Sequence, residues 1–179
     1  MQKGVPQIMD ITSIKSVLHN LSKEVLPSRF ETAQQPEPNI IQFCLRGIRS
    51  QTWIEVSWNS DSPRILKIKK PEKKGAESTL SKQLRYGLKY MALVSIEQEK
   101  FERVIKFGFA KKPGDEIIKY LIFELMGKHS NIFYLDKNYK IISLGKQINS
   151  NQSSFRTIST GSIYSGPPVN LKKQPREDE

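Results

Sequence analysis

The spacing of apolar residues near the start of the chain predicts an amphipathic helix. Between Ile11 and Val25 apolar side chains recur every three or four positions, which is the period of a helix with one buried face. Asp10 or Thr12 can cap this helix by accepting a hydrogen bond from its free N–H groups. Pro27 is expected to end it.

A second helical period begins at Ser78 or Thr79. Its apolar stripe consists of Leu80, Leu84, Leu88 and Met91. Lys82, Arg85 and Lys89 fall at helical spacing on another face. The preceding residues 69–78, KKPEKKGAES, contain Pro, Gly and repeated Lys without an apolar anchor. We therefore expect a flexible basic loop leading into a helix with a basic face.

Elsewhere the apolar period falls to two, which predicts strands. In the segment 53–58, Ile54, Val56 and Trp58 share one face, whereas Trp53, Glu55 and Ser57 share the other. The remaining strands are predicted at 40–48, 64–68, 93–98, 103–109, 117–124, 131–136 and 140–145. The order helix, strands, helix, strands favours an α+β fold, with antiparallel β-sandwich-like sheets flanked by two helices. We expect one domain over residues 10–168, after a loose leader (1–9) and before a disordered charged tail (169–179).

The net charge of the chain indicates which kind of partner it binds. Among the 179 residues, 29 Lys and Arg outnumber 18 Asp and Glu, a net charge of +11. Such a surplus favours a polyanionic partner, although simple solubility is the alternative. No apolar run approaches the ~20 residues of a membrane helix, and the start lacks an apolar signal-peptide core. The single cysteine, Cys44, sits in an apolar stretch, where a buried thiol is expected. These features fit a cytoplasmic protein without a membrane partner.

Catalytic and cofactor-binding patterns are absent from the sequence. The two histidines, His19 and His129, form no metal-binding pair, and the single cysteine cannot build a metal cluster. No glycine-rich phosphate loop or nucleophile elbow occurs. We therefore expect a protein that is not an enzyme and that has no cofactor.

Basic side chains provide the candidate binding residues. Between positions 64 and 89 the chain carries nine Lys and Arg against Glu72 and Glu77. A lysine loop joined to a basic helix can follow a phosphate backbone, whereas a solvated charged face is the alternative. The candidates for contact with a nucleic-acid backbone are Lys69, Lys70, Lys73, Lys74, Lys82, Arg85 and Lys89.

One octet carries a family resemblance. Residues 124–131 read ELMGKHSN, followed by IFYLD. This resembles the signature turn of the NFACT N-terminal domain, found in RqcH and fibronectin-binding protein A-like proteins of the ribosome quality-control family. The matching signature residues are Glu124, Gly127, Lys128, His129 and Asn131. Other motifs follow in the family's order: Asp10, Leu84, Arg85, Glu102, Arg103, Ser154, Phe155, Arg156, Gly161, Tyr164, Pro167 and Pro168. The Glu-Arg step and the PGD turn are most similar to cyanobacterial members.

The resemblance implies an RNA-binding function. Such proteins bind stalled large ribosomal subunits that hold peptidyl-tRNA, recruit alanine tRNA and support untemplated C-terminal alanine tailing. The resemblance implies that Glu102 and Arg103 engage tRNA, with Asp10 beside them. The family fold is similar to the N-terminal domain of formamidopyrimidine-DNA glycosylases, but the Pro-Glu start of those enzymes is missing here. A glycosylase-like enzyme and a fibronectin-binding adhesion module are the alternatives.

The chain departs from the family pattern in two ways. Glu102 replaces the usual Asp of the acidic-Arg pair, so the carboxylate sits one methylene farther from the backbone. Full-length members also continue into a helix-hairpin-helix segment, a coiled coil and a second RNA-binding domain. We therefore do not expect tailing from this chain alone.

Overall fold

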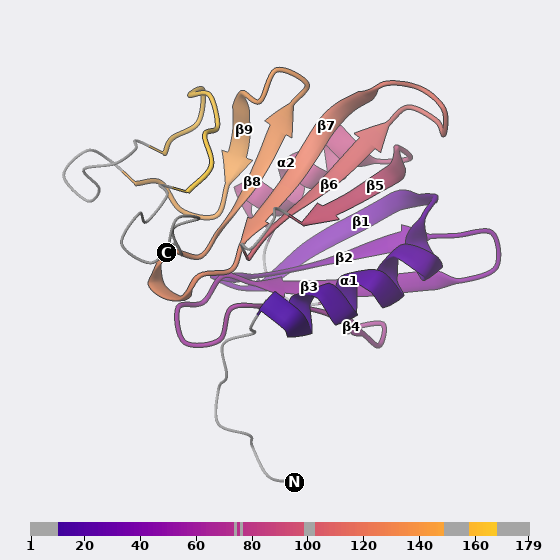
Figure 1. Ribbon diagram of the computed structural model, residues 1–179, viewed down its shortest axis with the longest axis horizontal. Coiled ribbons are helices and arrows are strands. Elements are labelled where there is room, and N and C mark those ends of the chain that lie inside the picture. The colour runs from indigo at the N-terminus through magenta and orange to yellow at the C-terminus, as the bar shows by residue number, and fades with distance from the viewer. Residues whose placement is uncertain (1–10, 74, 76, 99–102, 149–157, 168–179) are drawn as a thin grey trace, which may run out of the picture.

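The computed structural model describes residues 11–73, 75, 77–98, 103–148 and 158–167 (Figure 1). These residues form two α-helices, one short 3-10 helix and nine strands. In chain order the elements are α1 (Ile11–Val25), β1 (Ser28–Glu37), β2 (Ile40–Arg46), β3 (Gln51–Ser57), β4 (Arg64–Ile68), α2 (Thr79–Leu88), β5 (Ala92–Gln98), β6 (Val104–Ala110), β7 (Ile117–Glu124), η1 (Gly127–His129), β8 (Asn131–Asp136) and β9 (Ile141–Leu144). The predicted α+β class is confirmed.

The nine strands form one antiparallel sheet in the order β4-β3-β2-β1-β5-β6-β7-β8-β9. Its two halves are joined where the start of β1 pairs with the start of β5, at Ser28 with Leu93 and Arg29 with Ala92. Backbone hydrogen bonds of Phe30 with Tyr90 and Met91 extend this pairing. Beyond this short seam the halves diverge (Figure 1). They enclose the larger of two clusters of buried hydrophobic residues rather than lying flat.

The aromatic core shows how the halves face each other. The ring of Phe43 on β2 lies 6.2 Å from that of Phe107 on β6 and 6.3 Å from that of Phe123 on β7. In the sheet order, β1 and β5 lie between β2 and β6, so these contacts cross the interior. The architecture is therefore sandwich-like. The expectation of separate sheets was wrong, since the β1–β5 seam makes the sheet continuous.

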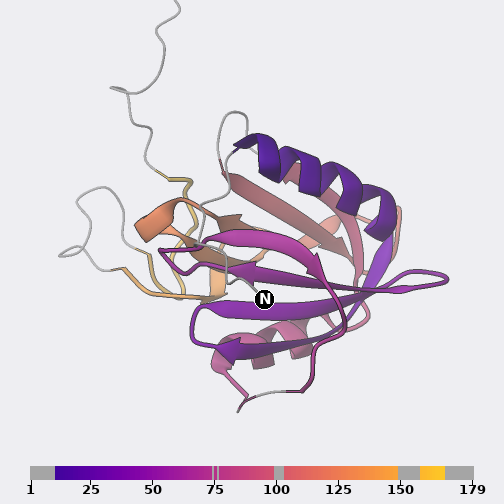
Figure 2. The same cartoon turned by 90° about the horizontal axis from the view of Figure 1, so that it is seen from below.

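The two helices close the open sides of this folded sheet. α1 packs against β4 and β5, and α2 against β1 and β9. Figures 1 and 2 show them on opposite sides of the molecule. Both predicted apolar stripes are confirmed, because Ile14, Leu18, Leu21 and Val25 of α1 and Leu80, Leu84 and Leu88 of α2 are buried. α2 begins at Thr79, one of the two predicted starts, and Ser78 caps it by accepting a hydrogen bond from the backbone N–H of Ser81.

The pattern of alternation missed β1. Its sequence, SRFETAQQPE, contains few apolar residues, and its register with β2 shifts between Phe30 and Thr32 and again between Gln34 and Glu37. A shift of register breaks strict alternation, so the period of two is lost. The strand predicted at 40–48 ends at Arg46, and Ile48 is fully exposed. The predicted leader and the predicted tail lie outside the described residues.

Candidate nucleic-acid interface

The lysine-rich segment after β4 is anchored to the sheet. Gln34 on β1 donates a hydrogen bond from Nε2 to the carbonyl oxygen of Glu72, at 3.0 Å. Ser78 donates from Oγ to Oε1 of Gln35, at 2.5 Å. The segment therefore runs from the edge strand β4 to β1, next to which α2 begins. The segment lacks an apolar anchor, as its sequence shows, and polar side chains of β1 hold it instead.

The charged side chains of this segment and of α2 face solvent. Lys69, Lys70, Lys73, Lys82 and Lys89 are exposed, and Arg85 is partly exposed. The guanidinium of Arg85 forms an ion pair with Glu77. We call these six residues the basic surface: Lys69, Lys70, Lys73, Lys82, Arg85 and Lys89. Lys74, the seventh backbone-contact candidate, lies outside the described residues.

Two tyrosines accompany the basic surface, and the sequence pattern did not single them out. Tyr86 is 73% exposed and Tyr90 is 62% exposed. The guanidinium of Arg85 lies 5.8 Å from the Tyr86 ring centroid, and Nζ of Lys89 lies 5.1 Å from that of Tyr90. Their signal in the sequence is the alternation of aromatic and basic residues at 85–90. Exposed aromatic rings beside cations are a typical platform for stacked bases.

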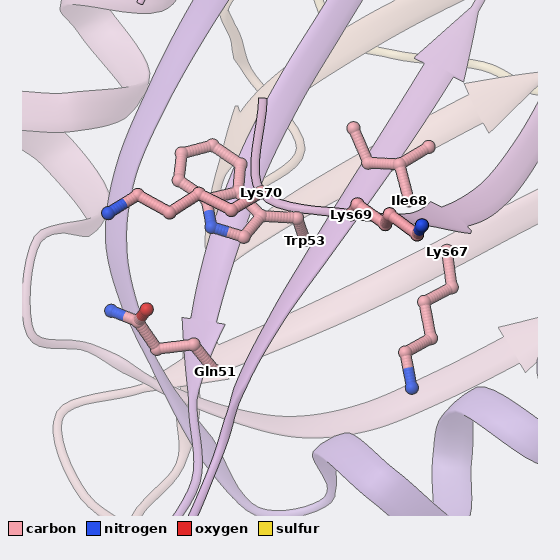
Figure 3. Close-up of a pocket in the computed structure, with 6 residues that line it drawn as sticks. All are labelled: Gln51, Trp53, Lys67, Ile68, Lys69 and Lys70. Carbon is pink, nitrogen blue, oxygen red and sulfur yellow. The ribbon is translucent and has the colours of Figure 1, made fainter. Parts of the chain in front are cut away.

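A pocket opens at the start of the lysine-rich segment. It has a volume of about 470 Å³ and is lined by Gln51, Trp53, Lys67, Ile68, Lys69 and Lys70 (Figure 3). Lys67 points away from the pocket centre toward α1, where its Nζ lies 2.8 Å from Oε2 of Glu24. The alternation in β3 placed Trp53 on the face opposite Ile54 but indicated no role for it.

A buried thiol and a carboxylate lie next to this pocket. Glu31 accepts hydrogen bonds from Arg46, from Gln51 at 2.8 Å and from the Cys44 thiol at 3.5 Å. Burial alone would raise the pKa of Glu31, but the hydrogen bonds from Arg46, Cys44 and Gln51 outweigh it and hold that pKa below its ordinary value. Burial, aided by the nearby Glu31, raises the pKa of Cys44 to about 12. The expected burial of Cys44 is confirmed.

Arg103 lies beside the signature turn. It directly precedes β6, and its carbonyl oxygen accepts a hydrogen bond from the backbone N–H of Leu125 at 2.9 Å. Its side chain is partly exposed. Asp10 and Glu102, the other two residues assigned to tRNA engagement, lie outside the described residues. Within the sheet, two strands, β5 and β6, lie between β7 and β1, the strand that anchors the lysine-rich segment.

The signature turn is built from buried polar contacts. Glu124 is fully buried, and Tyr164 donates a hydrogen bond to its Oε2 at 2.5 Å. Asn131 is also fully buried. Its Oδ1 accepts from the backbone N–H of Lys146 at 3.0 Å, and its Nδ2 donates to the carbonyl oxygen of Lys146 at 2.8 Å. These two residues therefore hold the fold together, rather than offering groups to a ligand.

The middle of the turn is its accessible part. Gly127 has φ 60°, a conformation that favours glycine. Lys128 and His129 are exposed. The backbone N–H of His129 donates to the carbonyl oxygen of Met126 at 3.2 Å, which closes the turn. Within the described part of the chain, no three His, Cys, Asp or Glu residues are placed to hold a metal ion, and no helix is long and apolar enough to cross a membrane.

Comparison with known families decides the relationship. A family model described as NFACT N-terminal and middle domains matches residues 10–179. The chain belongs to this family. The NFACT chain is 31% identical over 156 residues to a protein named Rqc2 homolog RqcH from Streptococcus pneumoniae, an alignment that covers 85% of this chain and 28% of that protein. It is also 26% identical over 163 residues to Rqc2 homolog RqcH of Bacillus subtilis, with coverage of 89% and 29%. The NFACT chain thus spans less than a third of the length of these relatives.

Solved structures share the fold. The N-terminal part of the fibronectin/fibrinogen-binding protein from Streptococcus suis superposes with a TM-score of 0.79 at 28% identity, covering 88% of this chain and 60% of that chain. The N-terminal domain of fibronectin-binding protein PavA from Streptococcus pneumoniae gives a TM-score of 0.75 at 29% identity, covering 90% and 64%. The resemblance drawn from residues 124–131 is therefore confirmed.

Proposed function

We propose that this NFACT chain is a non-catalytic RNA-binding domain of ribosome-associated quality control. In this proposal it engages stalled large ribosomal subunits that hold peptidyl-tRNA and takes part in recruiting tRNA for untemplated C-terminal alanine tailing. The observation that carries the proposal is the basic surface, with exposed tyrosines at its side. Membership of a family whose relatives are named Rqc2 homolog RqcH supports the ribosomal setting.

The charges of the basic surface suit a phosphate backbone. Among the described residues, the five lysines of this surface have no ion pair, whereas Arg85 is paired with Glu77. Unpaired lysines attract phosphates and release the counterions condensed on RNA, which makes binding depend steeply on salt. Tyr86 and Tyr90 add ring faces on which unpaired bases can stack.

Arg103 is proposed as a second point of contact, with Asp10 and Glu102 assigned beside it by the family resemblance. Its backbone is tied to Leu125 at the start of the signature turn. The turn also presents the exposed side chains of Lys128 and His129. A guanidinium held near such a turn can bind phosphate bidentately, which a lysine cannot do.

The direct test is binding of the purified chain to tRNA and to large ribosomal subunits. Anisotropy with labelled tRNA, measured at several salt concentrations, reports affinity and its salt dependence. Co-sedimentation compares subunits that carry peptidyl-tRNA with empty subunits. We expect salt-sensitive tRNA binding and preferential sedimentation with the loaded subunits. Absence of binding to both RNA partners at low salt would refute the proposal.

The names of the solved relatives favour one alternative function. Two of them are called fibronectin-binding or fibronectin/fibrinogen-binding proteins. If this chain is an adhesion module, it binds immobilised fibronectin at physiological salt after nuclease treatment, and antibodies detect it on intact cells. If it is the RNA-binding domain proposed above, nuclease-treated protein retains salt-sensitive tRNA binding and stays undetected on the cell surface.

A further inference from the structure

The pocket beside β3 and β4 has the size and composition of a small-ligand site. Its volume of about 470 Å³ falls in the range of pockets that hold small molecules. Gln51 and Trp53 come from β3, Lys67 and Ile68 from β4, and Lys69 and Lys70 from the residues that follow. An aromatic ring, an amide and the stems of three lysines therefore line one cavity, and of the three lysines Lys70 lies across the Trp53 ring in Figure 3.

Trp53 is placed differently from the aromatic residues of the core. It points to the face of β3 opposite the buried Ile54 and Val56, and its strand neighbours are Cys44 on β2 and Ile68 on β4. Its indole Nε1 is shielded from solvent but has no hydrogen-bond partner in the described part of the chain. Trp58 Nε1 and Ser28 Oγ are also buried without a hydrogen-bond partner among the described residues, but they do not line the pocket. An unsatisfied buried N–H is unfavourable, and a bound acceptor atom would remove that cost.

The charges around the pocket favour an anion. Lys67 is neutralised by Glu24, at 2.8 Å. Glu31 is engaged by Arg46 and Gln51. Among the described residues, Lys69 and Lys70 have no ion pair, and both are exposed. In the view of Figure 3 the side chain of Lys70 extends across the Trp53 ring, with Nζ beyond it. The uncompensated positive charge of Lys70 thus lies beside the Trp53 ring, and that of Lys69 lies at the other side of the pocket.

We propose that this pocket binds one nucleotide of single-stranded RNA, with the base against Trp53 and the phosphate on Lys70. The inference rests on the RNA-binding function proposed above and adds a specific site to it. Gln51 donates from Nε2 to Glu31, which leaves its Oε1 to accept a hydrogen bond from a base amino group. An acidic peptide would match the lysines, but it would leave the flat aromatic wall without a stacking partner.

Tryptophan fluorescence of the full chain tests the site directly. The chain has two tryptophans, and Trp58 is only 1% exposed, so stacking of a base quenches Trp53 selectively. The probe is an oligoadenylate of about eight nucleotides, within the range of single-strand binding sites. We expect saturable quenching of the wild type. In Trp53→Phe we expect no quenching of the remaining Trp58, with the circular dichroism spectrum preserved.

Two double variants of equal net charge distinguish the contribution of the pocket lysines to binding from that of the net charge of the chain. Lys69 and Lys70 precede Pro71, and Lys111 and Lys112 precede Pro113 in the β6–β7 turn, so the chain contains the same tripeptide twice. All four lysines are exposed. We expect Lys69→Ala/Lys70→Ala to weaken oligoadenylate binding about tenfold, because the lysine that neutralises the phosphate and the neighbouring positive charge are removed. We expect Lys111→Ala/Lys112→Ala to leave the affinity near that of the wild type.

The outcomes distinguish failure of the pocket inference from failure of the proposed RNA-binding function. If labelled oligoadenylate binds by anisotropy but neither quenches Trp53 nor responds to Lys69→Ala/Lys70→Ala, the pocket inference fails and the RNA-binding function stands. If neither oligoadenylate nor tRNA binds, the RNA-binding function itself fails. Equal quenching by polyphosphate or by oligoglutamate would show an anion site or a site for an acidic peptide, and would overturn the nucleotide assignment.

Discussion

Tyr164 donates a hydrogen bond to the buried carboxylate of Glu124 at 2.5 Å, across 40 positions of sequence. Glu124 ends β7, and Tyr164 belongs to the segment that follows β9. The ring of Tyr164 also lies 4.8 Å from that of Phe133 on β8. The hydrogen bond and the ring contact of Tyr164 therefore connect the C-terminal part of the described chain to β8 and the signature turn.

Replacing Tyr164 by Phe removes the hydroxyl while keeping the ring. We expect the free energy of unfolding to fall by about 1–3 kcal/mol, because a buried carboxylate loses a donor. Urea denaturation measures the change. Tyr86→Phe is the control, since Tyr86 is 73% exposed and its hydroxyl faces solvent. Equal losses of stability in the two variants would show that the hydrogen bond to Glu124 contributes little.

Gly87 is required where α2 crosses β8. A Cβ atom at this position would lie 2.0 Å from Oη and 2.9 Å from Cζ of Tyr134, which is itself 1% exposed. We expect Gly87→Ala to destabilise the protein by about 1–3 kcal/mol through overpacking, even though Ala favours helix by about 1 kcal/mol. Thermal and urea unfolding report the effect.

Two variants check this explanation. Adding Tyr134→Phe removes the closest atom and should recover part of the lost stability. Gly166→Ala, at a position where an added Cβ meets nothing within 4 Å, should leave the unfolding midpoint near that of the wild type. A stable Gly87→Ala protein would mean that α2 moves away from β8 at little cost.

Arg103→Ala should weaken tRNA binding while leaving the fold intact. Removal of a charge-assisted hydrogen bond to phosphate corresponds to roughly 10- to 100-fold in the dissociation constant. The assay is anisotropy with labelled tRNA at matched salt, together with urea midpoints for both proteins. Arg49→Ala removes the same charge from an exposed position between β2 and β3 and serves as the control. Wild-type affinity in a well-folded Arg103→Ala protein would contradict a role in tRNA engagement.

Replacing Lys69, Lys70, Lys73 and Lys74 by Ala should flatten the salt dependence of RNA binding. The slope of log affinity against log salt should decrease in magnitude by about one for each phosphate that is no longer neutralised by a lysine. The control removes four lysines that are exposed elsewhere: Lys111, Lys112, Lys137 and Lys140. The two variants carry the same net charge, so a larger change in the first identifies the lysine-rich segment. An unchanged slope would exclude that segment from the interface.

Cys44 should be unreactive in the folded protein. Its pKa is raised to about 12 by burial and by the neighbouring Glu31, so the nucleophilic thiolate is scarce at pH 8. Ellman's reagent should label it only after unfolding in urea. Because the pKa is raised on folding from 9.0, the neutral thiol is favoured in the folded state. Its contribution is complete below pH 9 and declines as pH rises toward 12.

The corresponding measurement compares the wild type with Cys44→Ala. The wild type should lose stability relative to this variant above pH 9, in urea unfolding at a series of pH values. Rapid labelling of native Cys44 at pH 8 would instead show that solvent reaches the outer side of β2.

Local patterns were sufficient for the helices and most strands. The period of 3.6 in α1 and α2 and the alternation in strands such as β3 arise because residues at that spacing along one element share one buried face. The apolar stripe of Leu80, Leu84 and Leu88 is an example, since all three are buried as the spacing predicts. β1 was not predicted, because the register shifts beside Phe30 and Gln34 interrupt the alternation of apolar and polar residues.

Residue order alone was enough to establish the fold class, two helices, eight of the strands, the basic segment and the octet at residues 124–131. Only the tertiary structure decided that Glu124 and Asn131 are buried, that one continuous sheet folds over the larger hydrophobic cluster, and that Trp53, Lys69 and Lys70 line one pocket. The physical reason is that periodicity reports which side of an element is buried. Pairing between strands, the seam between β1 and β5, and contacts such as Tyr164 with Glu124 depend on residues far apart in sequence.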